Sequence, residues 1–223
     1  MSNDRTIVKI CGVTRLEDAR VALAAGADWL GFIRWPRSPR FRPIDELADL
    51  LSALRADPAA PPFDAVGVYV NAAPADIESE LARAGFDRIQ LHGDEPSDFA
   101  SALARDLARP ILKAVPIIDE SSLARAAAYE GVDLLTDAHD PARRGGTGRP
   151  FDYALLRPLA ARRRVIVGGG LTAETVAAVI RDVRPWGVDV SSAVETAPGV
   201  KDAALVRRFI DAVRNAGGVS PMT

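Results

Sequence analysis

Two kinds of segment alternate along the 223 residues of the chain. Short runs rich in Val, Ile and Leu are typical of buried strands, and longer runs with apolar residues at positions i, i+3, i+4 and i+7 are typical of amphipathic helices. Strands are expected at residues 6–11, 28–33, 65–70, 88–92, 111–115, 132–137, 165–167 and 188–190. Helices are expected at residues 16–25, from 43, from 74, from 96, at 120–129, at about 153–161, from 173 and at 202–215.

This alternation predicts the fold class. Strands that are apolar along nearly their whole length, separated by helices, indicate a parallel sheet covered by helices. Dividing 223 residues by eight gives about 28 residues per unit, enough for one strand, one helix and two short loops. We therefore expect an α/β protein with a single (β/α)8 TIM barrel over residues 1–216 and a loose tail at 217–223. An open doubly wound sheet is the alternative.

Composition narrows the class of protein further. Hydrophobic residues make up 48% and charged residues 26%, and the net charge of −2 gives no electrostatic case for nucleic-acid binding. The single cysteine cannot form an internal disulfide, so a reducing cytoplasm is the expected setting. No signal peptide and no run of about 18 apolar residues is present, so no membrane partner is expected. Two histidines without a cysteine pair argue against a structural zinc site, and we expect no cofactor.

Candidate chemistry is found where the predicted strands end. In such a barrel, reactive groups gather at the carboxyl ends of the strands and in the loops that follow. Cys11 ends the first strand, Asp137 the sixth, Gly168–Gly170 the seventh and Ser191–Ser192 the eighth. These groups are therefore expected at one mouth.

Cys11 and Asp137 each allow two interpretations. Gly12 is expected to turn the chain and expose the thiol at the rim, where a positive environment near Lys9 lowers a thiol pKa from about 8.5; the alternative is a buried apolar cysteine. Asp137 is either a cap or a general acid, and an acid needs burial to raise its pKa from about 3.9. Asp133 and Asp140 are its rivals.

The glycines and serines after the last two strands indicate a phosphate site. Phosphate sites in these barrels use the loops after strands seven and eight, with backbone N–H groups and hydroxyls as donors. Gly169 and Gly170, followed by a helix, and Ser191 and Ser192, followed by a short turn, match this arrangement, although two ordinary turns are possible.

Three further features could belong to the same mouth. His92 ends the fourth strand and is expected to line the mouth as a hydrogen-bonding group. Arg40, in the loop after the second strand, is either a surface charge or a donor to a substrate carboxylate. The glycine-rich segment 143–148 is a flexible linker or a lid.

The motifs, in their order along the chain, resemble the phosphoribosylanthranilate isomerase family of tryptophan biosynthesis. The resemblance covers nearly the whole chain. It is carried by Lys9-Ile-Cys-Gly12, Gly31-Phe-Ile with Ser38-Pro-Arg40, Val66-Gly-Val-Tyr-Val-Asn71, Ile89-Gln-Leu-His-Gly93, Gly145-Gly-Thr-Gly148 with Phe151-Asp152, Gly169-Gly-Leu171 and Gly187-Val-Asp-Val-Ser-Ser192.

The resemblance implies an Amadori rearrangement of N-(5-phosphoribosyl)anthranilate to 1-(2-carboxyphenylamino)-1-deoxyribulose 5-phosphate. It implies that Asp137 is the general acid, that Cys11 is the base and that Arg40 meets the substrate carboxylate. The phosphate would lie against Gly169, Gly170, Ser191 and Ser192, with further substrate contacts from His92, Gly146 and Asp189. The expected partner is thus a small phosphorylated substrate, bound by a monomer or a homodimer.

The sequence departs from the family pattern at three places. Arg34 stands where an apolar residue is common, Ala193 where glycine is usual, and Leu171-Thr-Ala-Glu174 replaces a more typical Asn-Pro helix start. Two other functions are the alternatives. One is a related isomerase of an aminoimidazole ribonucleotide, whose family has a carboxylate at the position of Cys11, and the other is a non-catalytic phosphate-binding barrel.

Overall fold

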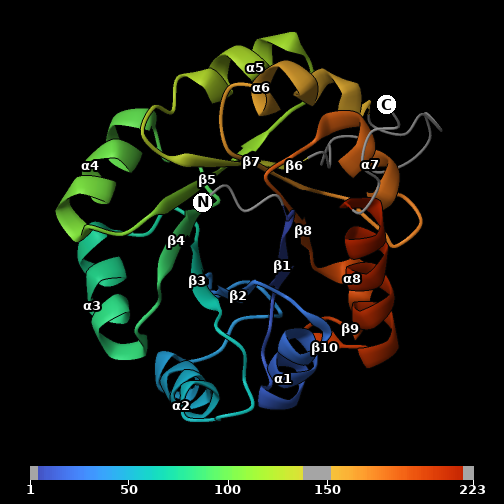
Figure 1. The fold of residues 1–223 in the computed structure, drawn as a ribbon. Coiled ribbons are helices and arrows are strands. Elements are labelled where there is room, and N and C mark those ends of the chain that lie inside the picture. The colour runs from blue at the N-terminus through green and yellow to red at the C-terminus, as the bar shows by residue number, and fades with distance from the viewer. Residues whose placement is uncertain (1–4, 138–151, 218–223) are drawn as a thin grey trace.

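The computed structural model describes residues 5–137 and 152–217, and its strands β1 to β8 form one closed parallel barrel (Figure 1). Each strand pairs with the next in sequence order, and β8 closes the circle against β1. The strands are β1 Ile7–Cys11, β2 Trp29–Ile33, β3 Asp64–Tyr69, β4 Arg88–Leu91, β5 Ile111–Pro116, β6 Asp133–Asp137, β7 Val165–Gly168 and β8 Gly187–Val190.

Helices surround the barrel on the outside (Figure 1). They are α1 Leu16–Ala25, α2 Ile44–Arg55, α3 Pro74–Ala84, α4 Ser97–Leu107, α5 Glu120–Ala127, α6 Arg157–Ala160, α7 Val176–Val183 and α8 Ala203–Gly217. Shorter elements complete the described chain: the 3-10 turns η2 Tyr153–Leu156 and η3 Ser192–Val194, and the hairpin of β9 Glu195–Ala197 with β10 Val200–Lys201.

The predicted barrel is confirmed, with corrections at individual elements. Pro43 and Pro96 precede α2 and α4 as N-cap residues with extended backbone, so these helices begin one residue later than predicted. The helix predicted from Ala173 begins at Val176 instead, because the hydroxyls of Thr172 and Thr175 accept backbone N–H bonds that hold the segment in a turn.

Two further differences from the prediction lie in the last part of the chain. The β9–β10 hairpin was not expected at all. The predicted loose tail begins at residue 217, which is the last residue of α8, and residues 218–223 lie outside the described part.

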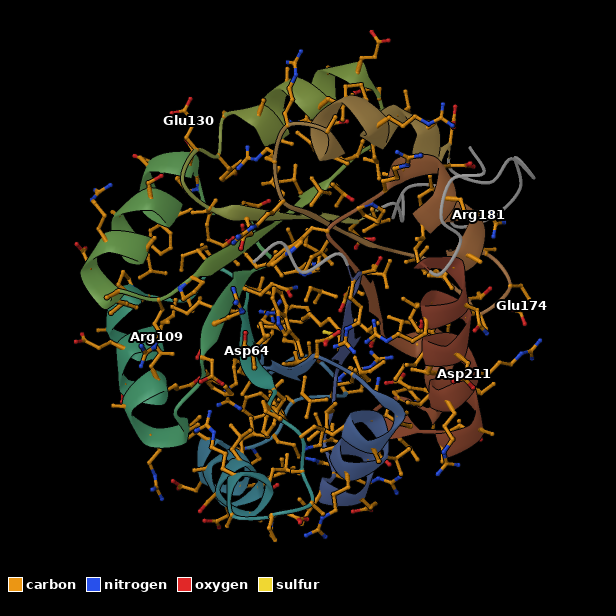
Figure 2. All side chains as sticks on the ribbon, viewed as in Figure 1. Asp64, Arg109, Glu130, Glu174, Arg181 and Asp211 are labelled. Atoms are coloured by element: carbon orange, nitrogen blue, oxygen red, sulfur yellow. The ribbon has the colours of Figure 1, made fainter. Side chains whose placement is uncertain are left out.

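Apolar packing holds the helices on the barrel. The buried faces of the helices, such as Leu47 and Leu51 of α2 or Phe209 and Val213 of α8, contact the outward side chains of the strands in one core cluster. Charged side chains such as Glu174, Arg181 and Asp211 extend from the outer surface (Figure 2). Within the described ranges, no helix has the length and apolar character needed to cross a bilayer.

The inside of the barrel has an apolar middle and more polar ends. Val66, Leu112, Ala114, Leu135 and Ile166 form the interior cluster together with Trp29. Because side chains alternate along a strand, the inward positions of β1 and β8 nearer the carboxyl end are taken by charged or reactive groups. Lys9 and Asp189 lie opposite each other in the β1–β8 register. The fold thus directs polar side chains to the carboxyl mouth of a closed barrel.

Candidate active site

A cavity of about 610 Å³ opens at the carboxyl ends of the strands. Nine of the ten predicted site residues line it, from six different strand ends or the loops after them. They are Cys11, Arg40, His92, Asp137, Gly169, Gly170, Asp189, Ser191 and Ser192. Gly146 and the rest of the segment 143–148 lie outside the described residues, as does Asp140.

Cys11 lies in the wall of the cavity and is more buried than predicted, with 6% of the residue exposed. Gly31 of the neighbouring strand makes room for the thiol, since a Cβ atom there would lie 2.9 Å from Sγ. Burial raises the pKa of the Cys11 thiol, and the charge of Lys9 opposes this rise without cancelling it. The expectation of an exposed thiol with a lowered pKa is therefore wrong, because the surrounding strands desolvate the sulfur.

A buried ion pair lies beside the thiol. Nζ of Lys9, whose side chain has no exposed surface, is 2.8 Å from Oδ1 of Asp189. Burial alone would lower the pKa of Lys9, but the charges of Asp189 and Cys11 outweigh it and raise this pKa. A fixed ammonium group therefore lies behind the cavity wall and stabilises a thiolate whenever one forms.

Asp137 lies across the cavity at the end of β6, next to the imidazole of His92. Oδ2 of Asp137 is 3.8 Å from Nε2 of His92, and the other ring nitrogen is 2.8 Å from Nε2 of Gln90. When the Gln90 amide donates, the neutral imidazole carries its proton on Nε2 and faces Asp137 with it. Asp133, the described rival, begins β6 near Arg88, 3.9 Å away, and does not line the cavity.

The glycines after β7 and the serines after β8 form the polar side of the cavity. Gly169 and Gly170 have φ values of +76° and +71°, a left-handed backbone that other residues adopt only at a cost. Thr172, Ser191 and Ser192 add hydroxyls to the same lining. Backbone N–H groups and hydroxyls gathered in this way can bind a phosphate without a metal ion.

Arg40 is not a free surface charge. Its side chain is 22% exposed, and its guanidinium makes a two-pronged ion pair with Glu195 of β9, with Nε 2.9 Å from Oε1 and Nη2 2.5 Å from Oε2. Glu195 also accepts from Nζ of the buried Lys201 at 2.8 Å. Arg40 is the sole Arg or Lys among the described cavity-lining residues.

The loop that carries Arg40 is anchored by Arg34. The guanidinium of Arg34, almost fully buried, binds both carboxylate oxygens of Glu80 in α3 at 2.7 Å. It also donates to the carbonyl oxygen of Arg42 and lies 4.8 Å from the centre of the Phe41 ring. The unusual arginine therefore joins both ends of this loop to α3, where an apolar residue could only pack.

An apolar wall faces the polar side of the cavity and was not predicted. It consists of Ile33, Trp35, Val68 and Val70, from β2, β3 and the segments that follow them. Trp35 is 39% exposed, which is high for so large an apolar side chain. Such a wall is suited to a flat aromatic group.

Sequence reasoning also missed Glu195 and Lys201 and did not pair Lys9 with Asp189. The pairing of Lys9 with Asp189 could have been found from the sequence. Each is a charged residue within an otherwise apolar strand, and β1 and β8 are neighbours in a closed barrel. Glu195 and Lys201 had no comparable signal, because the two short strands that carry them show no periodicity.

Comparison with protein families gives one clear match. Residues 8–212 match the family model for N-(5'phosphoribosyl)anthranilate (PRA) isomerase. The chain is 44% identical over 204 residues to N-(5'-phosphoribosyl)anthranilate isomerase of Pelobacter propionicus, covering 91% of this chain and 93% of that protein. It is 44% identical over 207 residues to the same enzyme of Thiobacillus denitrificans, covering 91% and 95%.

Solved structures agree with this match. The crystal structure of phosphoribosyl anthranilate isomerase from Thermotoga maritima superposes with a TM-score of 0.84 at 36% identity, covering 94% of this chain and 99% of that one. A phosphoribosyl anthranilate isomerase in complex with reduced 1-(o-carboxyphenylamino)-1-deoxyribulose 5-phosphate gives a TM-score of 0.81 at 34% identity, covering 94% and 99%.

Proposed function

The chain belongs to the N-(5'-phosphoribosyl)anthranilate isomerase family and isomerises N-(5'-phosphoribosyl)anthranilate in tryptophan biosynthesis, and we propose that Asp137 is its general acid and Cys11 its general base. The product is 1-(2-carboxyphenylamino)-1-deoxyribulose 5-phosphate. The observation that carries the proposal is that a thiol from β1 and a carboxyl from β6 line one cavity together with the glycine and serine turns.

Asp137 acts first, on the furanose ring. It donates a proton to the ring oxygen, the bond from C1 to that oxygen breaks, and the nitrogen lone pair forms the C1=N bond of a protonated Schiff base. His92 supports this step because its Nε2–H, 3.8 Å from the Asp137 carboxyl, stabilises the carboxylate that remains after the proton is donated.

Cys11 acts second, on C2. Its thiolate removes the C2 proton, and the bonding electrons form a C1=C2 double bond and neutralise the nitrogen, giving an enolamine. Loss of the C2 hydroxyl proton and addition of a proton at C1 then give the ketone. Lys9 supplies the positive charge that the thiolate needs, because burial raises the pKa of the thiol.

The rest of the cavity binds the two ends of the substrate. The phosphate lies against the backbone at Gly169 and Gly170 and the hydroxyls of Ser191 and Ser192, while Gly146 and Asp189 add contacts to the sugar phosphate. Arg40 binds the carboxylate of the anthranilate ring, for which a planar guanidinium is well shaped. The ring itself packs on the wall of Ile33, Trp35, Val68 and Val70.

A direct assay tests the function. Purified protein is mixed with N-(5'-phosphoribosyl)anthranilate, loss of the substrate is followed by the fluorescence of the anthranilate group, and the product is identified by carbon NMR of the new C2 ketone. We expect turnover without added metal or cofactor. Turnover of an aminoimidazole ribonucleotide in place of this substrate, or binding of the reduced product without any turnover, would contradict the proposal.

We also propose where the enzyme works and in which oligomeric state. We place the enzyme in the cytoplasm, because its buried thiol must stay reduced to act as a base. It works as a monomer or a homodimer; the Thermotoga maritima enzyme, for which monomers have been generated, is described as dimeric. Sedimentation of the purified protein distinguishes the two states.

A further inference from the structure

The ion pair between Arg40 and Glu195 divides the Arg40 guanidinium into two edges. Glu195 occupies the edge formed by Nε and Nη2, at 2.9 and 2.5 Å. The second edge, formed by Nη1 and Nη2, makes no hydrogen bond within the described ranges 5–137 and 152–217. A guanidinium has five N–H donors in a rigid fork, so fixing one edge also fixes the direction of the other.

The stem of Arg40 is held in place as well. A Cβ atom on Gly12 would lie 2.5 Å from Cδ of Arg40, so the side chain passes directly over the turn that follows Cys11. The same Cβ position is 3.1 Å from Oγ of Ser191. Arg40 therefore crosses the point where the turn after Cys11 meets the turn after β8.

Lys201 connects Glu195 to these two turns. Its Nζ donates to the carbonyl oxygen of Cys11 at 2.5 Å, to that of Ser191 at 3.2 Å and to Oε1 of Glu195 at 2.8 Å. An ammonium group has three donors, and all three are used. The side chains of Lys201 and Glu195 are 1% and 4% exposed, so these contacts are shielded from water and are not weakened by it.

We propose that Glu195 is a positioning residue, which fills one edge of the Arg40 guanidinium and aims the other edge at the substrate carboxylate. In this arrangement Lys201 ties Glu195 to the carbonyls of Cys11 and Ser191. The spacing between the carboxylate site, the base and the phosphate turn is thereby fixed. The proposal rests on the role given to Arg40 above and adds how the enzyme selects a substrate whose aromatic ring bears a carboxylate.

Two ligands measure this selection directly. The first ligand is reduced 1-(o-carboxyphenylamino)-1-deoxyribulose 5-phosphate. The second is the same compound without the carboxyl group on its ring. The ratio of their dissociation constants, measured by titration calorimetry, is the carboxylate preference. We expect Arg40→Met to abolish it. We expect Glu195→Gln to reduce it about tenfold, the equivalent of one charge-assisted hydrogen bond, and to leave the affinity for the second ligand nearly unchanged.

Matched variants separate positioning from folding. Glu95→Gln makes the same change in another buried pair, since Glu95 lies 2.7 Å from Nζ of Lys113 and both side chains are 3% exposed or less. Glu95 does not line the cavity, so this variant should keep the preference. If Glu195→Gln does not fold, Glu195→Leu combined with Lys201→Met removes both charges together and should show the same loss of preference.

The outcomes are distinct. An unchanged preference in Glu195→Gln, or an equal loss of affinity for both ligands, would overturn the positioning role. An increased preference would overturn it too, because Glu195 would then compete with the substrate for Arg40. If the unmodified protein and Arg40→Met both show no preference, the role of Arg40 in the proposed function is wrong, and the inference is wrong with it.

Discussion

At the amino end of the barrel Arg88 and Arg164 lie over the rings of Trp29 and Trp186, at 4.2 and 4.9 Å from the ring centres. The two rings meet edge to face, 5.2 Å apart, and Trp29 is 4% exposed. This end is closed by apolar rings, with each cation on a ring face. At the carboxyl end Asp189 and Cys11 line an open cavity instead, and the buried Lys9 lies against Asp189.

The difference between the two ends separates stability from function. Packed aromatic rings lower the free energy of the folded chain, whereas buried charges and left-handed glycines raise it unless something compensates. Cys11, the Lys9–Asp189 ion pair and the left-handed Gly169 and Gly170 lie at the carboxyl end, around the cavity that nine of the predicted site residues line. Substitutions at the two ends should therefore affect different quantities.

The largest effect is expected from the two reacting groups. Cys11→Ala and Asp137→Asn should each lower kcat by about 10²–10⁴-fold, the usual contribution of a general acid or base, with little change in the free energy of unfolding. Substrate loss by fluorescence and thermal unfolding measure the two quantities. A variant that keeps near-full turnover would show that its residue has another role.

Trp29→Ala, at the closed end, should lower the free energy of unfolding and leave kcat nearly unchanged. Removing a buried tryptophan costs about 3–5 kcal/mol of unfolding free energy. We expect kcat to stay within about twofold, because Trp29 begins β2, whereas Cys11 and Asp137 are the last residues of β1 and β6. Urea unfolding and the same fluorescence assay, both in the cold, measure these effects. A large fall in kcat at full folding would show that the two ends are coupled.

The two ends of the barrel differ in how much of their structure the sequence predicts. The barrel follows from periodicity, and the rule that chemistry lies at the carboxyl ends of strands brings Cys11, Asp137 and Ser191 to one cavity as predicted. The closed end could not be predicted, because Trp29 and Trp186 are 157 residues apart (186 − 29) and no local pattern links a residue of β2 to the residue before β8.

The details of the open end depend on tertiary burial. Whether Cys11 has a raised or a lowered pKa depends on the strands that desolvate it, and Lys9 alone suggested the wrong direction. Ile33 and Val68 have the same sequence pattern as core residues, although they face the cavity. Glu195 and Lys201 act through contacts with residues far away in the chain or across a short hairpin, which a local pattern does not contain.

The pH dependence of activity tests the electrostatics of the open end. Because burial raises the pKa of Cys11, the thiolate fraction should rise with pH through the neutral range, by up to about tenfold per pH unit, and kcat/KM should follow it over the range in which Asp137 stays protonated. Lys9→Met should raise this pKa further and move the rise to higher pH by about one unit or more, because the stabilising charge is lost.

Asp189, the ion-pair partner of Lys9, provides a control in which the pKa of Cys11 should shift in the opposite direction. The negative charge of Asp189 raises the pKa of Cys11, so Asp189→Asn should lower it and move the rise to lower pH. Pulsed alkylation of the thiol across the pH range reports the same pKa without turnover. Shifts of the two variants in the same direction would show that the changes are structural rather than electrostatic.

The smallest effects are expected from alanine substitution of one glycine at each end of the barrel. Gly170 after β7 and Gly131 before β6 have φ values of +71° and +74°, and at both positions an added Cβ would meet no atom within 4 Å. Alanine at either position should cost about 1 kcal/mol of unfolding free energy, from the strained left-handed backbone alone. Only Gly170→Ala should also weaken inhibition by inorganic phosphate, by several-fold, because its backbone lines the cavity. Equal phosphate inhibition in the two variants would mean that the phosphate does not bind at the turn after β7.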